Sequence, residues 1–233
     1  MKKSFFAIIL AVAFAFTTAV VTCVRALNAQ EVGAFSTQMR IVVDAGHGGI
    51  DGGVTGIKTG VKESDLNLSI AFLLKEELED KGFEVILTRK TEGGLYGTTA
   101  KGFKKRDMQK RKECVEEAQP QMLISVHQNF YPSHSTRGAQ VFYSPKSEGS
   151  KAFAEGVQTS LNTLYSSQKV KGRGCKEGEF FMLECYPCPS VIVECGFLSN
   201  AKDEALLVTK SWQTAVAQAV AGGVLAYFAQ ATA

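Results

Sequence analysis

The chain has 233 residues, of which 45% are hydrophobic and 21% charged, so it can bury a full core and lacks a disorder-type composition. Its formal charge of +3 comes from Lys2, Lys3 and Arg25 near the amino terminus, because the remainder carries 23 basic and 23 acidic residues. A neutral body argues against nucleic acid as a partner, since such binding draws on a clustered excess of Lys and Arg.

The first 29 residues are predicted to be an export segment rather than part of a domain. A basic start precedes an apolar run from Phe5 to about Val24, which is typical of a signal peptide or an uncleaved amino-terminal anchor. The run approaches the roughly 20 residues needed to span a bilayer. Leu27-Asn28-Ala29 is only a mediocre cleavage site, so an anchor is favoured. We therefore predict an exported protein with a linker at 30–39 and one catalytic domain at 40–233.

Strands and helices alternate along the rest of the chain. Within the first predicted helix, the apolar residues from Leu66 to Leu78 follow helical spacing, and Gly82 ends the pattern. The expected strands are 41–43, 83–87, 122–126, 138–143 and 190–194, and the expected helices are 65–81, 104–118, 150–164 and a final helix with an apolar stripe over 212–227. This alternation predicts an α/β fold, a single three-layer domain with a largely parallel twisted sheet flanked by helices.

Three residues that can bind a metal directly follow apolar strands. His47 comes after the first strand and opens a glycine-rich turn, while His127 and Glu194 follow the third and last clear strands. The carboxyl ends of parallel strands form the binding crevice of open α/β sheets, so these side chains should converge. A single strand-end histidine is usually structural. The repeated pattern, in a chain with only three histidines, instead favours a metal site, and two imidazoles with carboxylates suggest zinc.

Glu63 lies at or just before the amino terminus of the first predicted helix, and two roles are open for it. A carboxylate there can simply complement the helix dipole. Its closeness to the His47 loop also makes it a candidate third ligand. From the residues alone, Glu63 and Glu194 could exchange the roles of metal ligand and catalytic base. His134 lies in a Ser-rich loop and is expected to be solvated.

Five cysteines lie outside the export segment, and this odd number excludes a complete disulfide framework. Cys185 and Cys188 have the spacing of a redox or zinc-knuckle pair, but a structural or incidental role is favoured. One disulfide, Cys185 with Cys188 or with Cys175, stays open. The basic run from Lys101 to Lys112 is expected to be the solvated face of a helix, with contact to an anionic polymer or membrane surface as the alternative.

Four ordered motifs carry a resemblance to a known family. They are Val43-Asp44-Ala45-Gly46-His47-Gly48-Gly49-Ile50-Asp51, Lys62-Glu63, Ser125-Val126-His127-Gln128-Asn129 and Val193-Glu194-Cys195-Gly196-Phe197-Leu198-Ser199-Asn200. In this order and spacing the chain resembles the zinc-dependent N-acetylmuramoyl-L-alanine amidases of the amidase-3 family. The similarity runs from about Arg40 to the final helix. The compact build is most similar to the CwlD-type amidases of spore-forming bacteria.

The resemblance implies that His47, Glu63 and His127 coordinate Zn²⁺ and that Glu194 is the catalytic carboxylate. It also implies hydrolysis of the amide bond between N-acetylmuramic acid and L-alanine in peptidoglycan. In the CwlD-like case this reaction serves spore cortex maturation, through muramic-δ-lactam formation, and germination. A location at the cell wall or spore envelope and an accessory protein are further expectations. Two alternatives are a zinc peptidase that acts within the stem peptide and a non-catalytic, membrane-tethered wall-binding protein.

Supporting roles are open for three more residues. Asp44 or Asn129 is a candidate to orient a ligand imidazole, although either can equally cap a turn. Arg89 is a candidate to contact a peptide carboxylate, but a surface salt bridge is favoured. Phe130 departs from the family, whose members commonly carry a small residue at that position, so fine specificity is not carried over.

Overall fold

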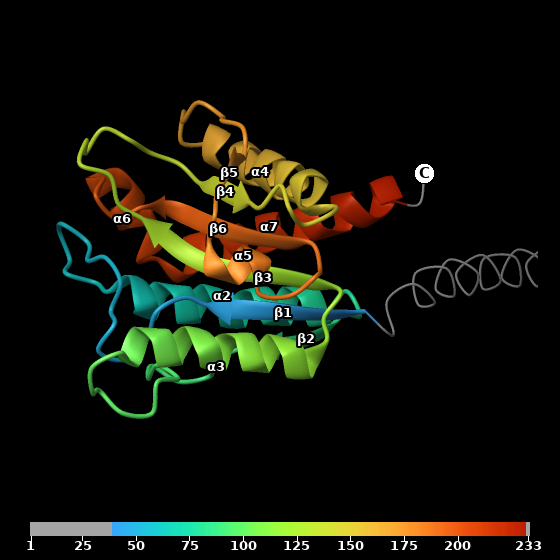
Figure 1. Cartoon of the computed structure of the whole chain (residues 1–233). Coiled ribbons are helices and arrows are strands. Elements are labelled where there is room, and N and C mark those ends of the chain that lie inside the picture. The colour runs from blue at the N-terminus through green and yellow to red at the C-terminus, as the bar shows by residue number, and fades with distance from the viewer. Residues whose placement is uncertain (1–38, 232–233) are drawn as a thin grey trace, which may run out of the picture. The chain divides into compact units, whose positions relative to one another are not determined.

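The computed structural model of the protein describes residues 39–231 (Figure 1). The predicted leader at 1–29 and all but the last residue of the predicted linker at 30–39 lie outside this range. A compact unit begins at Arg40. Among the described residues, no helix combines the length and apolar character required to cross a membrane.

A six-stranded sheet forms the centre of the fold (Figure 1). Its strands are β1 (Arg40–Ala45), β2 (Glu84–Leu87), β3 (Met122–Asn129), β4 (Gln140–Tyr143), β5 (Lys176–Glu177) and β6 (Ser190–Phe197), and their order across the sheet is β2-β1-β3-β6-β4-β5. Every neighbouring pair is parallel except β4 with β6, which is antiparallel. The predicted largely parallel sheet is therefore confirmed.

Helices cover both faces of the sheet, as predicted. They are α2 (Glu63–Glu79), α3 (Phe103–Ala118), α4 (Ser150–Ser166), α5 (Phe181–Glu184), α6 (Ala201–Leu207) and α7 (Lys210–Ala231). On one face, α7 packs against both α2 and α4, which contact the strands. On the other face, Val42 and Leu123 of the sheet pack against Val115 of α3 and Met182 of α5. Figure 1 shows α3 and α5 on the viewer's side of the sheet.

The strand register brings the carboxyl ends of three strands together. Ala45 of β1 pairs with Val126 of β3, and the next residue, His127, pairs directly with Glu194 of β6. Because β1, β3 and β6 run parallel, the residues that follow β1 face the same edge as these two side chains. The three predicted strand-end residues therefore lie at one edge of the sheet.

Several boundaries differ from the predictions. β3 and β6 continue three residues beyond their predicted ends, to Asn129 and Phe197, because their pairing persists across a register shift between His127 and Asn129. The first helix begins at Glu63 rather than near Asp65. The two-residue strand β5 and the four-residue helix α5 were not predicted, since elements this short have no measurable periodicity.

Candidate active site

His47 is held by a glycine turn at the end of β1. Its φ of 61° is in the left-handed region, which is uncommon for a residue other than glycine. The adjacent Gly46 allows the close approach of His127, since a Cβ at position 46 would lie 2.2 Å from His127 Nε2. The amide of Gly46 donates to the carbonyl of Val126 at 3.1 Å, so the His47 turn and β3 are joined directly.

Glu63 is the first residue of α2, and it is only 2% exposed. Its Oε2 accepts a hydrogen bond from the amide of Val54 at 2.9 Å, and its Oε1 accepts one from the amide of Gln128 at 3.1 Å. Gly53 is required for this packing, because a Cβ there would lie 2.4 Å from Oε2. The carboxylate is therefore fixed from both sides and at the positive end of a helix.

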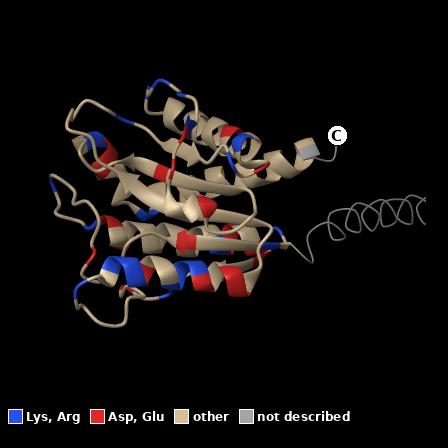
Figure 2. Ribbon diagram, in the orientation of Figure 1, with Lys and Arg blue, Asp and Glu red and all other residues tan. Residues whose placement is uncertain are grey.

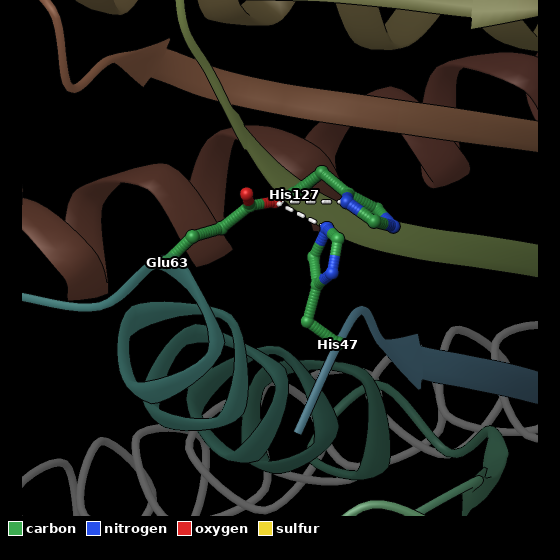
Figure 3. Close-up of side chains that lie close together, drawn as sticks. All are labelled: His47, Glu63 and His127. Carbon is green, nitrogen blue, oxygen red and sulfur yellow. Dashed lines mark hydrogen bonds and ion pairs between the residues drawn. The ribbon is translucent and has the colours of Figure 1, made fainter. Parts of the chain in front are cut away.

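The side chains of His47, Glu63 and His127 meet at one point (Figure 3). Glu63 Oε1 lies 2.9 Å from His127 Nδ1 and 3.4 Å from His47 Nε2. One ligand atom from each residue falls within 4.8 Å of the others. Two imidazole nitrogens and one carboxylate oxygen form a donor set typical of catalytic zinc, which keeps three protein ligands and an open position. The residues present therefore fit a metal ion.

The charges within this cluster shift the pKa of Glu63 and of His47 toward their charged forms. Burial would raise the pKa of Glu63, but hydrogen bonds and charge interactions with the two histidines outweigh burial and hold the pKa well below its usual value. Burial would lower the pKa of His47, but Glu63 and Asp51 outweigh it and raise the pKa. The carboxylate is therefore ionised at neutral pH and available as a ligand.

Glu194 lies beside the cluster in a different environment. Its Oε2 is buried and has no hydrogen-bond partner among the described residues. Burial raises the pKa of this carboxyl to about 7. A carboxyl with a pKa near neutrality can both accept and donate a proton, which suits general acid–base chemistry. The two glutamates thus differ in their pKa: the low pKa of Glu63 suits a metal ligand, and the raised pKa of Glu194 suits a group that transfers protons.

Two buried arginines fix the backbone beneath the site. Arg89 is 2% exposed and donates to the carbonyls of Ala45, Gly46 and Ser64 at 2.8, 3.1 and 2.7 Å. Both predicted roles for Arg89, contact with a peptide carboxylate and a surface salt bridge, are therefore wrong. The guanidinium instead ties the His47 turn to the start of α2.

Arg111 is 1% exposed, although it belongs to the basic run that was expected to be solvated. It donates to Asp44 at 2.6 Å, to Asp107 at 2.7 Å and to the carbonyl of His47 at 2.5 Å. Burial would raise the pKa of Asp44, but the charge of Arg111 and two hydroxyl hydrogen bonds outweigh it and lower the pKa to about 2. The other basic residues of the run are exposed or half-buried, so among them the prediction fails at Arg111.

Neither residue predicted to orient an imidazole makes a recorded hydrogen bond to one. The carboxylate of Asp44 accepts from Thr88, Ser125 and Arg111. Asn129 Oδ1 accepts from the amide of the next residue, Phe130, at 2.8 Å, at the end of β3. Asp44 therefore joins three side chains near the site, and Asn129 contacts the backbone at the end of β3.

The remaining sequence expectations concern residues outside the cluster. His134 is exposed, as expected, and its Nδ1 also lies 2.6 Å from the carbonyl oxygen of Ser199. All five cysteines in the described part of the chain are free, so the disulfide left open between Cys185 and Cys188 or Cys175 does not form.

Sequence reasoning missed two residues that hold the site together. Asn67 donates to the carbonyl of Gly46 at 3.1 Å and to Glu63 Oε1 at 3.3 Å. The sequence could have revealed Asn67, since helical spacing places it one turn after Glu63 on the buried face of α2. Glu204 of α6 accepts from the amides of Lys58 and Thr59 and so fixes the segment before Glu63. A separation of about 145 residues hides that contact from local sequence patterns.

Comparison with known proteins assigns the chain to a family. The family described as N-acetylmuramoyl-L-alanine amidase matches residues 41–226, which is most of the chain and all four motifs. The chain therefore belongs to the N-acetylmuramoyl-L-alanine amidases of the amidase-3 family. It is a hydrolase that cleaves an amide bond in peptidoglycan.

Particular members that the chain resembles include a germination-specific amidase and a CwlD amidase. It is 31% identical over 198 residues to the germination-specific N-acetylmuramoyl-L-alanine amidase of Bacillus subtilis, with 82% of this chain and 80% of that protein covered. The CwlD amidase of Clostridioides difficile, solved in complex with the GerS lipoprotein, is 33% identical, with a TM-score of 0.78 over 83% of this chain and 100% of that chain. The chain is thus a CwlD-type amidase.

Proposed function

We propose that the enzyme is zinc-dependent and that His47, Glu63 and His127 hold the ion. The observation that carries this proposal is the convergence of their ligand atoms within 4.8 Å of one another, beside a glutamate whose buried Oε2 lacks a partner. When bound, zinc would act as a Lewis acid that polarises the scissile carbonyl. It would also lower the pKa of a water molecule, so that hydroxide is available as the nucleophile near neutral pH.

The protein supplies the proton transfers. Glu194, with its pKa near 7, takes a proton from the attacking water and delivers it to the departing nitrogen of L-alanine. An amide nitrogen leaves poorly without this proton. Glu63 does not share this role, because its strongly lowered pKa keeps it ionised. The structure therefore gives a physical reason for assigning the two glutamates as the family resemblance does.

Product analysis of the purified full chain tests the reaction. Muropeptides treated with the enzyme should release a free lactyl group on muramic acid and a stem peptide that begins with L-alanine. Cleaved bonds within the stem peptide, with lactyl-alanine intact, would instead show a peptidase. E194A should lose activity while its zinc content stays that of the wild type, and H47A should lose zinc. Full activity of E194A would contradict the catalytic role.

The biological setting is also a proposal. Likeness to a germination-specific amidase supports a role in germination and in spore cortex maturation. In cortex maturation, muramic-δ-lactam would form later from the freed lactyl groups. The complex of the similar CwlD amidase with a lipoprotein supports an accessory protein as a partner. Export through residues 1–29, with anchoring or release, would place the enzyme at the wall or spore envelope. Deletion of the gene and analysis of cortex muropeptides for the lactam tests this role.

A further inference from the structure

The ring of His47 has a second contact on the side opposite the metal cluster. Its Nε2 faces Glu63, while its Nδ1 lies 3.2 Å from Oδ2 of Asp51. We propose that Asp51 is a positioning residue for His47: its carboxylate accepts a hydrogen bond from Nδ1–H of the ring and so presents the unprotonated Nε2 to a divalent metal ion. This inference rests on the proposed metal site and adds a residue outside the three ligands.

The His47 turn holds the backbone of Asp51 close to that of His47. The amide of Gly48 donates to the carbonyl of Asp51 at 2.8 Å, and the amide of Asp51 donates back to the carbonyl of Gly48 at 3.2 Å. Between them, the amide of Ile50 donates to the hydroxyl of Tyr96 at 2.9 Å. The backbones of His47 and Asp51 thus belong to one closed turn, so only the rotations of the two side chains remain to be ordered when the ring and the carboxylate pair.

The backbone of His47 and its ring have separate supports. Arg111 holds the carbonyl of His47 at 2.5 Å, which stabilises the left-handed backbone conformation. That contact leaves the ring free to rotate about its own bonds. Among the described residues, Asp51 and Glu63 are the acidic side chains that pair with the ring, and only Asp51 pairs with Nδ1. Asp51 is therefore the group that selects the ring orientation and the tautomer.

Lys104 of α3 contacts the other oxygen of Asp51, with its Nζ 3.2 Å from Oδ1. Figure 2 shows Lys and Arg gathered at the first turns of α3, where the helix dipole disfavours cations. The Lys104 side chain is 66% exposed, whereas that of Asp51 is 24% exposed. Because exposed ion pairs contribute about 0–1 kcal/mol, Lys104 should assist only slightly, and the Asp51 carboxylate itself should carry the effect.

The chemistry of metal-bound histidines predicts the size of the effect. A carboxylate that accepts a hydrogen bond from the second ring N–H raises the basicity of the ligand nitrogen, and its loss weakens metal binding by about 10–100-fold. D51A removes the acceptor altogether. D51N keeps an acceptor oxygen in nearly the same place but removes its charge. The zinc dissociation constant should therefore rise from wild type to D51N and rise further in D51A.

The experiment measures zinc affinity of the full chain by competition with a chromogenic chelator. We expect D51A to raise the zinc Kd by about 10–100-fold, D51N to fall between D51A and wild type, and K104Q to stay near wild type. D80N is the matched control, because Asp80 is an exposed carboxylate at the end of α2, away from the cluster. Wild-type affinity in both Asp51 variants would overturn the proposal.

A second readout separates positioning from simple loss of structure. The chain has only three histidines, so their ring resonances can be assigned by NMR with single substitutions. The Nδ1 proton of His47 should give a protected, hydrogen-bonded signal in the wild type and lose that protection in D51A, while the unfolding midpoint of the metal-free protein stays close to wild type. An unchanged His47 signal in D51A would overturn the proposal. Wild-type protein that binds no zinc would instead overturn the proposed metal site itself.

Discussion

Substitution of Gly46 by alanine tests the geometry of the site most directly. The new Cβ would lie 2.2 Å from His127 Nε2, whereas ordinary contact begins near 3.4 Å, so one of the two must move by about 1 Å. The backbone of Gly46 has little freedom to move, because its amide donates to Val126 and its carbonyl accepts from Asn67 and Arg89. The displacement therefore falls on the imidazole of His127.

A shift of about 1 Å at a catalytic group costs about 100-fold in rate. We expect G46A to lower kcat/KM on muropeptides by about that factor, which corresponds to about 2.7 kcal/mol of transition-state stabilisation, and to weaken zinc binding. The φ of Gly46 is outside the left-handed region, so alanine adds no backbone strain. The overall fold should persist and can be checked by circular dichroism.

The matched control is G174A, because a Cβ at Gly174 would meet nothing within 4 Å and its φ is also outside the left-handed region. This variant should bind zinc and hydrolyse muropeptides like the wild type. If G46A also matched the wild type in zinc affinity and kcat/KM, the close packing of the His47 turn on His127 would not matter for the site, and the reasoning would be refuted.

Three further predictions follow from burial and charge. In metal-free protein, burial raises the pKa of Glu194 to about 7 in the folded state from 4.5 in the unfolded chain, so stability is lost as the pH rises from 4.5 to about 7. In urea titrations, E194Q should therefore be more stable than the wild type at pH 8 and equal to it below pH 4.5. If E194Q and the wild type were equally stable at both pH values, the inference that Glu194 is a buried carboxylate without a partner would be contradicted. R111M should lower the free energy of unfolding by about 3–5 kcal/mol, because Asp44 is left as an uncompensated buried charge, and R111M/D44N should recover part of the loss. Removal of metal with a chelator should lower the melting temperature, and zinc at about 100 times its Kd should restore about 2.7 kcal/mol, while no shift would argue against a bound ion.

The parts of the site that the sequence could predict share one physical cause. Parallel strands end at the same edge of a sheet, so the three apolar runs alone predict that His47, His127 and Glu194 lie close together. The direct pairing of His127 with Glu194 could not, since register depends on contacts between strands that lie 60 or more residues apart. The assignment of Glu63 required the family resemblance, because a helix-start carboxylate has an ordinary structural role.

The supporting residues escaped prediction for a different reason. Arg89 and Arg111 look like surface residues in the sequence, because charged side chains are mostly exposed. Their burial depends on carbonyls of the His47 turn that lack partners within their own strand, and no local pattern reveals such a need. The same holds for Asp44, whose three partners come from β2, β3 and α3 or their ends.

The direction of β1 has a practical consequence for handling the enzyme. This strand starts at Arg40 and advances six residues, or roughly 20 Å, before the chain reaches the histidine turn. A tag fused directly to Arg40 would thus begin at the rim of the sheet opposite to that turn. Protein shortened to that residue could be immobilised through such a tag without covering its hydrolytic edge.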